Sequence, residues 1–331
     1  MMRAIFSRLL VGCVLALAAG CASAAGGSSV KLHGTDYVNT TYLARQTGLA
    51  KAWVVPQKKL VLKGKSTRLE LEAGSRDFEL DGFRVFLGEP AVAHRSSLYI
   101  SRIDRDRFLL PILDPRKIPG PRPALRTIVI DAGHGGKDNG AQNTRLKLRE
   151  KDMALDVALR LERHLKKAGY RVVLTRRKDV FIPLPLRPAR ATKEKADLFI
   201  SIHFNALENQ RVSGTETYIL TPQNQRSTSS ERPTSADKVR HSGNGEDPWN
   251  AVLGYRMHRS LVGAMQTDDR GLKRARFAVL RDLDCPGLLV EGGYLSNDTE
   301  ARKIATPAWR ERLAVAIAGG VAQYRSALGQ R

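Results

Sequence analysis

The chain has 331 residues, of which 42% are hydrophobic and 27% are charged, and its formal charge is +22 at pH 7. This composition excludes a globally disordered protein, and the length suggests one large or two ordinary domains. The strong positive charge favours polyanionic surroundings, which means nucleic acid inside a cell, or acidic peptides, wall polymers and anionic lipid outside it.

The first 24 residues have the pattern of a secretory signal peptide. Arg3 and Arg8 precede an apolar run that is too short to span a membrane as a helix. Two processing routes stay open, because Ala22-Ser23-Ala24 suits ordinary signal peptidase, whereas "LAAGC" resembles a bacterial lipobox that would attach a lipid at Cys21. We predict an exported protein of the periplasm or cell envelope, soluble or lipid-anchored. This location argues against nucleic acid as a partner.

Residues 28–114 are predicted to form a small, strand-rich α+β domain. The segments "KLVLKG", "TRLELEAG", "FELDGFRVFLG" and "SSLYIS" alternate apolar with polar residues, which is the period of a half-buried strand. The segment "YVNTTYLARQTGL" indicates one short helix. Residues 115–125 contain four prolines and a glycine, so they predict an extended, semi-rigid linker.

Residues 126–328 are predicted to form an α/β domain with a mainly parallel, twisted sheet flanked by helices. The strand patterns "TIVIDAG", "YRVVLTR", "DLFISIHFNA", "GTETYIL" and "PGLLVEGGYL" alternate with helical patterns such as "EKDMALDVALRLERHLKKAG". This alternation is typical of a parallel sheet. Residues 221–248 almost lack large apolar residues and cannot build a core, so they predict a mobile polar insertion.

Four side chains with metal or acid–base chemistry lie near the edge where sites form in open α/β sheets. His134 follows a strand in "VIDAGHGGKDNGA", Glu150 opens the next helix, and His203 lies near the end of a later strand. Two histidines and a carboxylate are a usual ligand set of catalytic zinc, and the glycines around His134 would leave room for a metal and a substrate. Glu291 lies inside an apolar strand, where a lone carboxylate is costly unless it has a partner or a catalytic task.

Ordinary structural interpretations of these residues stay open. His134 could be solvated, His203 could be a hydrogen-bonded core residue, and most acids placed like Glu150 simply favour a helix start. Three further residues are candidates for supporting the metal ligands or binding substrate, namely Asp131, Arg187 and Asn205. We expect Asp131 to hold the imidazole or its loop, and Arg187 could bind a substrate carboxylate.

Five segments in order resemble the zinc-dependent N-acetylmuramoyl-L-alanine amidases of the amidase-3 family. They are "VIDAGHGGKDNGA", "REKDMALDVALRL", "TRRKDVFIPLPLR", "ADLFISIHFNA" with "SGTETYIL", and "FAVLRDLDCPGLLVEGGYLSN". The resemblance implies that His134, Glu150 and His203 bind Zn²⁺ and that Glu291 is the general base. It implies hydrolysis of the amide between the lactyl group of N-acetylmuramic acid and L-alanine in peptidoglycan, with a protein activator as a further partner. Some relatives carry a helix that blocks the zinc where this chain has residues 221–248, whose composition does not resemble such a helix.

The small domain resembles, more loosely, the copper amine oxidase N-terminal-like domain of bacterial envelope proteins. The segments "DYVNTTYLARQTGL" and "FELDGFRVFLGEP" carry this resemblance, and no cluster of copper ligands accompanies it. It implies cell-wall binding or positioning of the catalytic domain, and a purely structural role stays open.

Two other functions stay open for the whole chain. A zinc peptidase that cuts within stem peptides could use the same metal site. A wall-binding protein that has lost catalysis is the other, although such a protein has no need for the buried acid Glu291.

Overall fold

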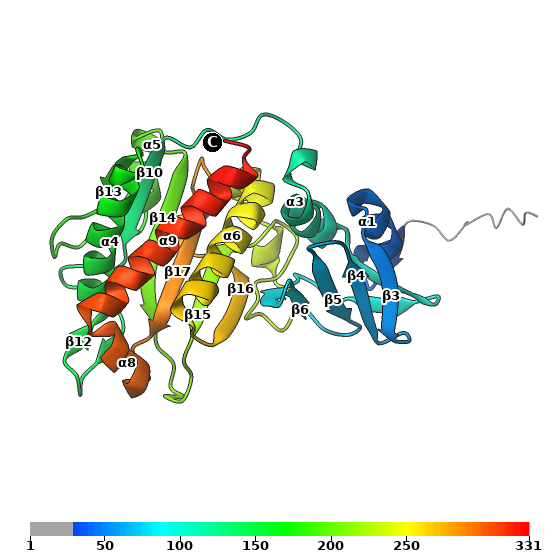
Figure 1. Ribbon diagram of the computed structural model, residues 1–331, viewed down its shortest axis with the longest axis horizontal. Helices are drawn as coiled ribbons and strands as arrows, with labels where there is room; N and C mark the ends of the chain where they lie inside the picture. The colour runs from blue at the N-terminus through cyan, green and yellow to red at the C-terminus, as the bar shows by residue number, and fades with distance from the viewer. Residues whose placement is uncertain (1–28, 331) are drawn as a thin grey trace, which may run out of the picture.

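The computed structural model describes residues 29–330, so the predicted leader and the choice at Cys21 lie outside the described residues. The N-terminal part is blue to cyan in Figure 1 and is rich in short strands. Its helix α1 (Thr40–Thr47) begins after Asn39, whose side chain accepts a hydrogen bond from the Thr41 amide, and ends at Gly48. The strands are β1 (Ser29–Leu32), β2 (Thr35–Asn39), β3 (Ala50–Val55), β4 (Lys59–Lys63), β5 (Arg68–Glu72), β6 (Asp77–Leu80), β7 (Phe83–Phe86), β8 (Val92–His94) and β9 (Ser97–Ser101).

The N-terminal part ends in a helical segment that the sequence analysis did not predict. It consists of α2 (Arg102–Asp104), a π-helical turn (Arg105–Leu109) and α3 (Leu110–Leu113), and a 3₁₀ turn (Pro115–Lys117) follows. Ser101 caps this segment, because its side chain accepts a hydrogen bond from the Asp104 amide.

The strands of the C-terminal part form a mainly parallel sheet, as predicted. Its strands are β10 (Thr127–Ala132), β13 (Arg171–Leu174), β14 (Leu198–Asn205), β15 (Thr215–Leu220), β16 (Asp269–Ala275) and β17 (Gly287–Tyr294), and a small separate ribbon pairs β11 (Gln142–Asn143) with β12 (Leu148–Arg149). Strands β10, β13, β14 and β17 pair in parallel, β15 is antiparallel to β17, and β16 is parallel to β15.

This sheet does not stop at the predicted linker. Strand β16 also pairs with β7 of the N-terminal part, with Leu272 opposite Val85. The strands therefore form one sheet of eleven, in the order β13-β10-β14-β17-β15-β16-β7-β6-β5-β4-β3. The sequence analysis missed β16, because its seven residues, "DRGLKRA", contain four charges and no clear apolar alternation.

Helices cover both faces of the C-terminal sheet. Helices α4 (Glu150–Lys167), α6 (Asp247–Met265) and α9 (Pro307–Ala327) lie side by side over one face (Figure 1), and the short helix α8 (Asp298–Ile304) leads into α9. Helices α5 (Leu186–Lys193) and α7 (Ala278–Arg281) pack on the other face. Strand periodicity divides β14 between these layers, because Ile200 and Ile202 join the large core whereas Phe199 joins the small one. His203 therefore points to the side of the thinner helix layer.

One large apolar core joins both parts of the chain. It extends from Val38 in β2 to Leu328 after α9 and includes N-terminal residues such as Leu69 and Val85. Among residues 29–330, no helix combines the length and the apolarity that crossing a membrane requires.

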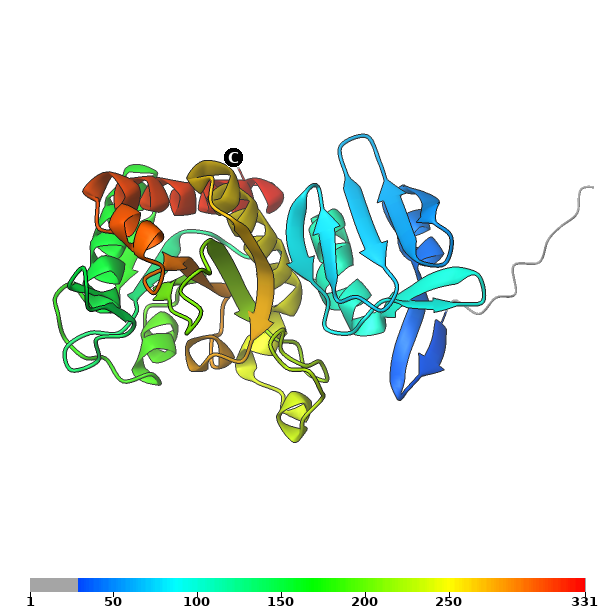
Figure 2. The ribbon, with the colours of Figure 1, turned by 90° about the horizontal axis from the view of Figure 1, so that it is seen from below.

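Residues 221–248 are held by polar contacts rather than apolar ones. They contain two 3₁₀ turns (Ser235–Lys238 and Ser242–Glu246) and are yellow-green in Figure 2. Arg76 of the N-terminal part donates to the carbonyl oxygens of Ser227 and Ser230, at 3.0 Å each, and Gln225 donates to Ser101 at 3.1 Å. Residues 221–248, whose polar composition predicted a mobile insertion, thus form hydrogen bonds with the N-terminal part. A sequence pattern of apolar residues could not have indicated these contacts.

A buried ion pair reinforces this contact between the two parts. Arg274 of β16 donates to Asp104 of α2 at 2.7 Å and to Gln225 at 2.6 Å. The side chains of Arg274 and Asp104 are 1% and 0% exposed. The guanidinium also lies 4.0 Å from the centre of the Phe108 ring. Both charges are therefore enclosed where the N-terminal part meets β16.

Candidate active site

His134 lies in the turn directly after β10, with a left-handed φ of +59°. Its Nδ1 lies 2.9 Å from Asp138 Oδ2, and the Asp138 carboxylate also accepts a hydrogen bond from the Gly140 amide at 3.0 Å. A hydrogen bond from Nδ1 to a carboxylate fixes the orientation of the ring and leaves the Nε2 lone pair free to bind a metal. The sequence analysis missed Asp138, although an acid four residues after a histidine in a glycine-rich turn is a usable signal.

Two glycines of this region leave the space that the neighbouring side chains occupy. A Cβ atom at Gly133 would collide with the His203 ring. A Cβ atom at Gly140 would collide with Glu150 and with His134, and the φ of Gly140 is +64°. The glycines therefore allow the histidines and the glutamate to approach one another.

Glu150 is the first residue of α4, and its carboxylate lies between the two imidazoles. Its Oε2 is 3.0 Å from His134 Nε2, and its Oε1 is 2.7 Å from His203 Nδ1. The backbone amides of Ala141 and Phe204 donate to it at 2.7 and 3.1 Å. Burial opposes ionisation of Glu150, but the hydrogen bonds from both histidines outweigh it and lower the pKa of this carboxyl.

The side chains of His134, Glu150 and His203 fit a zinc ion. Their candidate ligand atoms all lie within 4.8 Å of one another, and the two imidazole rings are 4.9 Å apart between centres. Two imidazoles and a carboxylate are the ligand chemistry of a catalytic zinc centre. The orienting contact from Asp138 is the kind of support that a histidine ligand needs. The structure thus brings together the three residues that the sequence predicted as zinc ligands, and we call them the metal group.

Glu291 lies beside the metal group on the neighbouring strand. It is the register partner of His203 in the pairing of β17 with β14. Its Oε2 atom is buried and has no hydrogen-bond partner within residues 29–330. Burial first, and then the charges of Glu150 and Glu216, raise the pKa of Glu291 well above its usual range, with only Lys273 opposing them. A carboxyl of this kind is suited to receive and release a proton.

Asp131 and Arg187 form a buried ion pair that holds the turn carrying His134. Arg187 donates to Asp131 at 2.8 Å and to the carbonyl oxygen of His134 at 2.9 Å. The two side chains are 0% and 2% exposed, for Asp131 and Arg187 respectively. Asp131 therefore holds the loop and not the imidazole. Binding of a substrate carboxylate by Arg187 does not fit the structure, because its guanidinium is enclosed and already paired.

Asn205 belongs to a second polar cluster, built around Glu216 of β15, which the sequence analysis missed. Glu216 is 1% exposed and is the register partner of Glu291. Its carboxylate accepts hydrogen bonds from the Tyr218 hydroxyl at 2.6 Å, from Lys273 Nζ at 2.6 Å and from Asn205 Nδ2 at 3.3 Å. The Tyr294 hydroxyl donates to the same carboxylate. The acidic residue in the middle of the strand pattern "GTETYIL" could have indicated this cluster.

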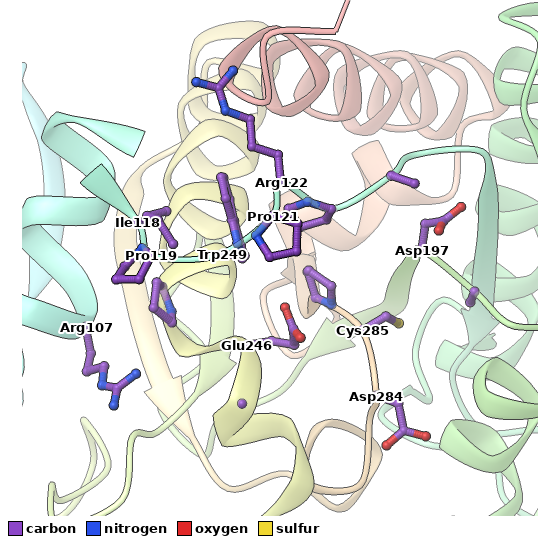
Figure 3. A pocket seen from close by; sticks show the side chains of 16 residues that line it. Arg107, Ile118, Pro119, Pro121, Arg122, Asp197, Glu246, Trp249, Asp284 and Cys285 are labelled. Carbon is purple, nitrogen blue, oxygen red and sulfur yellow. The ribbon is translucent and has the colours of Figure 1, made fainter. Parts of the chain in front are cut away.

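A separate pocket of about 480 Å³ lies at the opposite, amino-terminal edge of the sheet (Figure 3). Linker prolines such as Pro121 line it together with Trp249 and Cys285. Burial raises the pKa of the Cys285 thiol to about 12, so this cysteine stays protonated and is a poor nucleophile. The acid–base and metal chemistry therefore lies at the other edge, with the metal group and Glu291.

Comparisons with known proteins agree with this geometry. Residues 128–323 match the Amidase_3 family, described as N-acetylmuramoyl-L-alanine amidase. The chain is 33% identical over 231 residues to the N-acetylmuramoyl-L-alanine amidase AmiC of Escherichia coli O6:H1. That match covers 63% of this chain and 55% of the relative, so the chain spans about half of the relative's length.

Solved amidase structures share the fold of the C-terminal part. The catalytic domain of CwlV, an N-acetylmuramoyl-L-alanine amidase of Paenibacillus polymyxa, has 33% identity and a TM-score of 0.51, over 61% of this chain and 99% of that one. The CwlD amidase of Clostridioides difficile, solved in complex with the GerS lipoprotein, has 27% identity and a TM-score of 0.51, over 61% of this chain and 98% of that one. Because the family match covers more than half of the chain, this protein belongs to the Amidase_3 family of N-acetylmuramoyl-L-alanine amidases.

Proposed function

We propose that the chain is a zinc-dependent peptidoglycan hydrolase that cleaves the amide between the lactyl group of N-acetylmuramic acid and L-alanine. The observation that carries the proposal is the position of Glu291, whose buried, unpartnered carboxyl oxygen lies one strand away from the metal group. A wall-binding protein without catalysis would gain nothing from this costly arrangement. The family match supports the choice of substrate.

His134, Glu150 and His203 would hold the Zn²⁺ ion. When bound, zinc supplies water of lowered pKa and polarises the amide carbonyl. Glu291 accepts the proton of the attacking water and delivers it to the amine of L-alanine as the carbon–nitrogen bond breaks. The products are the free lactyl carboxylate and a stem peptide with a free amine. Asp138 and Arg187 keep His134 and its loop in place throughout.

Export and wall association belong to the same proposal. The leader-like first 24 residues support a periplasmic or envelope location, with a lipid at Cys21 as the alternative to a soluble protein. The N-terminal part, which resembles the copper amine oxidase N-terminal-like domain, would bind the wall or position the catalytic part. A protein activator is supported by the CwlD amidase, which was solved in complex with a lipoprotein.

Digestion of purified peptidoglycan by the mature protein tests this function. We expect mass spectrometry to find stem peptides that begin with a free L-alanine amine. These products should disappear with a chelator and return with added zinc. Cuts inside the stem peptide would identify a peptidase instead. Binding to peptidoglycan without any cleavage, by protein that holds zinc, would identify a wall-binding protein.

A further inference from the structure

The polar cluster around Glu216 includes two cations on β16, Arg270 and Lys273, that the proposed reaction leaves without a task. We propose that Arg270 and Lys273 form a subsite that binds a carboxylate of the departing stem peptide, and that the protein therefore prefers stem peptides with free acidic groups. This inference rests on the proposed amidase function, because it names the part of the substrate that β16 contacts.

The first argument is position, because the register of the strands builds a row of side chains on one face of the sheet. His203, Glu291 and Glu216 are register partners across β14, β17 and β15, and register partners point to the same face. Lys273 continues the row on the next strand, since it is the partner of Tyr218, two residues from Glu216 on the same face. Lys273 therefore lies on the far side of Glu291 from the metal group.

The second argument is charge. Lys273 Nζ donates to Glu216 Oε1 at 2.6 Å, and Arg270 Nε lies 4.0 Å from the same oxygen. Two cations thus share the Glu216 carboxylate, and Arg270 reaches it only at the outer limit of an ion pair. Arg270 Nε is buried and has no hydrogen-bond partner in the described part of the chain. A carboxylate arriving here would meet donors whose charge Glu216 does not balance.

The third argument is access. The Arg270 and Lys273 side chains are 34% and 18% exposed, whereas the side chain of Glu216 beneath them is buried. Lys273 Nζ lies 5.8 Å from the centre of the Tyr218 ring, which packs against Phe277 with ring centres 5.1 Å apart, and Phe277 is 37% exposed. The cluster therefore has a buried carboxylate that holds the cations in place, and an open side that faces solvent.

The direction of the proposed reaction assigns this subsite to the peptide. Glu291 delivers a proton to the departing amine, so the peptide leaves over Glu291. Lys273 lies further along the same row and Arg270 lies near the same Glu216 carboxylate, so both cations are away from the metal group and face the peptide and not the glycan. The ligand class is a carboxylate on an acidic residue of the stem peptide, near the alanine.

The test compares two substrates and a matched pair of variants. The substrates are purified peptidoglycan and the same material after its stem carboxyls have been converted to amides with carbodiimide and ammonia. We expect the unmodified protein to cleave the acidic substrate with a kcat/KM roughly ten- to a hundredfold higher, since charge-assisted hydrogen bonds are lost on amidation. Arg270→Gln should bring this ratio close to one, mainly through KM, and Arg270→Lys should restore part of it. Arg302→Gln, which removes an exposed cation on α8, should leave the ratio unchanged.

The failures of the two ideas are distinguishable. Equal cleavage of both substrates by the unmodified protein would overturn the subsite and leave the amidase function intact. A preference that survives in Arg270→Gln would also overturn it, and Lys273→Gln, which keeps the Glu216 carboxylate, repeats the measurement on the second cation. If neither substrate yields a free L-alanine amine, the proposed function itself fails.

Discussion

A single carboxylate organises the metal group. Glu150 joins the turn after β10 to strand β14, because it contacts His134 and the amide of Ala141 on one side and His203 on the other. A buried charge of this kind is stable only when its oxygens are fully engaged, and Glu150 has four such contacts. The histidines then need support of their own, which Asp138 supplies to His134.

Replacing Asp138 with alanine should weaken zinc binding by roughly ten- to a hundredfold, because His134 would lose the acceptor that fixes its orientation. Competition with a chromophoric chelator at pH 7 measures this affinity. Asp282→Ala is the matched control, since Asp282 is an exposed acid that lies just before β17, at the opposite edge of the sheet. Equal affinities for the two variants would show that Asp138 does not support the ligand.

The two faces of strand β16 make different contacts. Leu272 and Arg274 point toward the large core and the N-terminal part, whereas Lys273 points to the face that carries Glu291. This strand joins β15 to β7 and so connects the two parts of the sheet. Among the residues of β16, we therefore expect Arg274 to contribute most to the stability of the fold, because its ion pair with Asp104 is shielded from water.

Replacing Arg274 with methionine should lower the free energy of unfolding by about 3–5 kcal/mol, because Asp104 would keep a buried charge without its partner. Denaturant unfolding followed by circular dichroism measures this change. The control Arg302→Met removes an exposed arginine and should alter stability by less than about 0.5 kcal/mol. A loss below about 1 kcal/mol in Arg274→Met would mean that this ion pair does not hold the two parts together.

At the scale of the whole molecule, the predicted linker does not separate two independent bodies. Residues 28–114 and 126–328 were predicted as separate domains, yet they share one sheet and one apolar core. The contacts of residues 221–248 with Arg76 and Ser101 add a third connection. Because the N-terminal part is fixed in this way, any ligand that it binds would have a constant orientation relative to the sheet edge that carries the metal group and Glu291.

Residues 29–330 should consequently unfold in one cooperative transition, because exposing the shared core in one part also removes its cover from the other. Differential scanning calorimetry of the mature protein measures this, through the ratio of calorimetric to van't Hoff enthalpy. A ratio near one is expected. Two resolved transitions would show instead that the parts unfold independently and that the β7–β16 pairing is weak.

The sequence predicted the three residues that the structure brings together as the metal group, and most strands of the C-terminal sheet. His134 and His203 could be found because each lies at or just beyond the end of an apolar strand. Glu291 could be found because a lone acid interrupts an apolar strand, and Glu150 because it opens a strongly periodic helix. The shared sheet could not be predicted, because β16 lacks an apolar pattern and its pairing with β7 joins residues far apart in the chain. The enclosure of Arg187 and the cluster around Glu216 depend on the same long-range packing.

The most direct test of the account is a measurement of zinc content and turnover on the same preparation of Glu291→Gln. The amide is close to the carboxyl in shape but cannot act as a base, and Glu291 is not one of the three proposed ligands. We predict about one zinc per chain, as in the unmodified protein, and a loss of turnover of roughly a hundred- to ten-thousandfold on peptidoglycan. Full turnover by the zinc-loaded variant would contradict the assignment of Glu291 as the base beside the metal group.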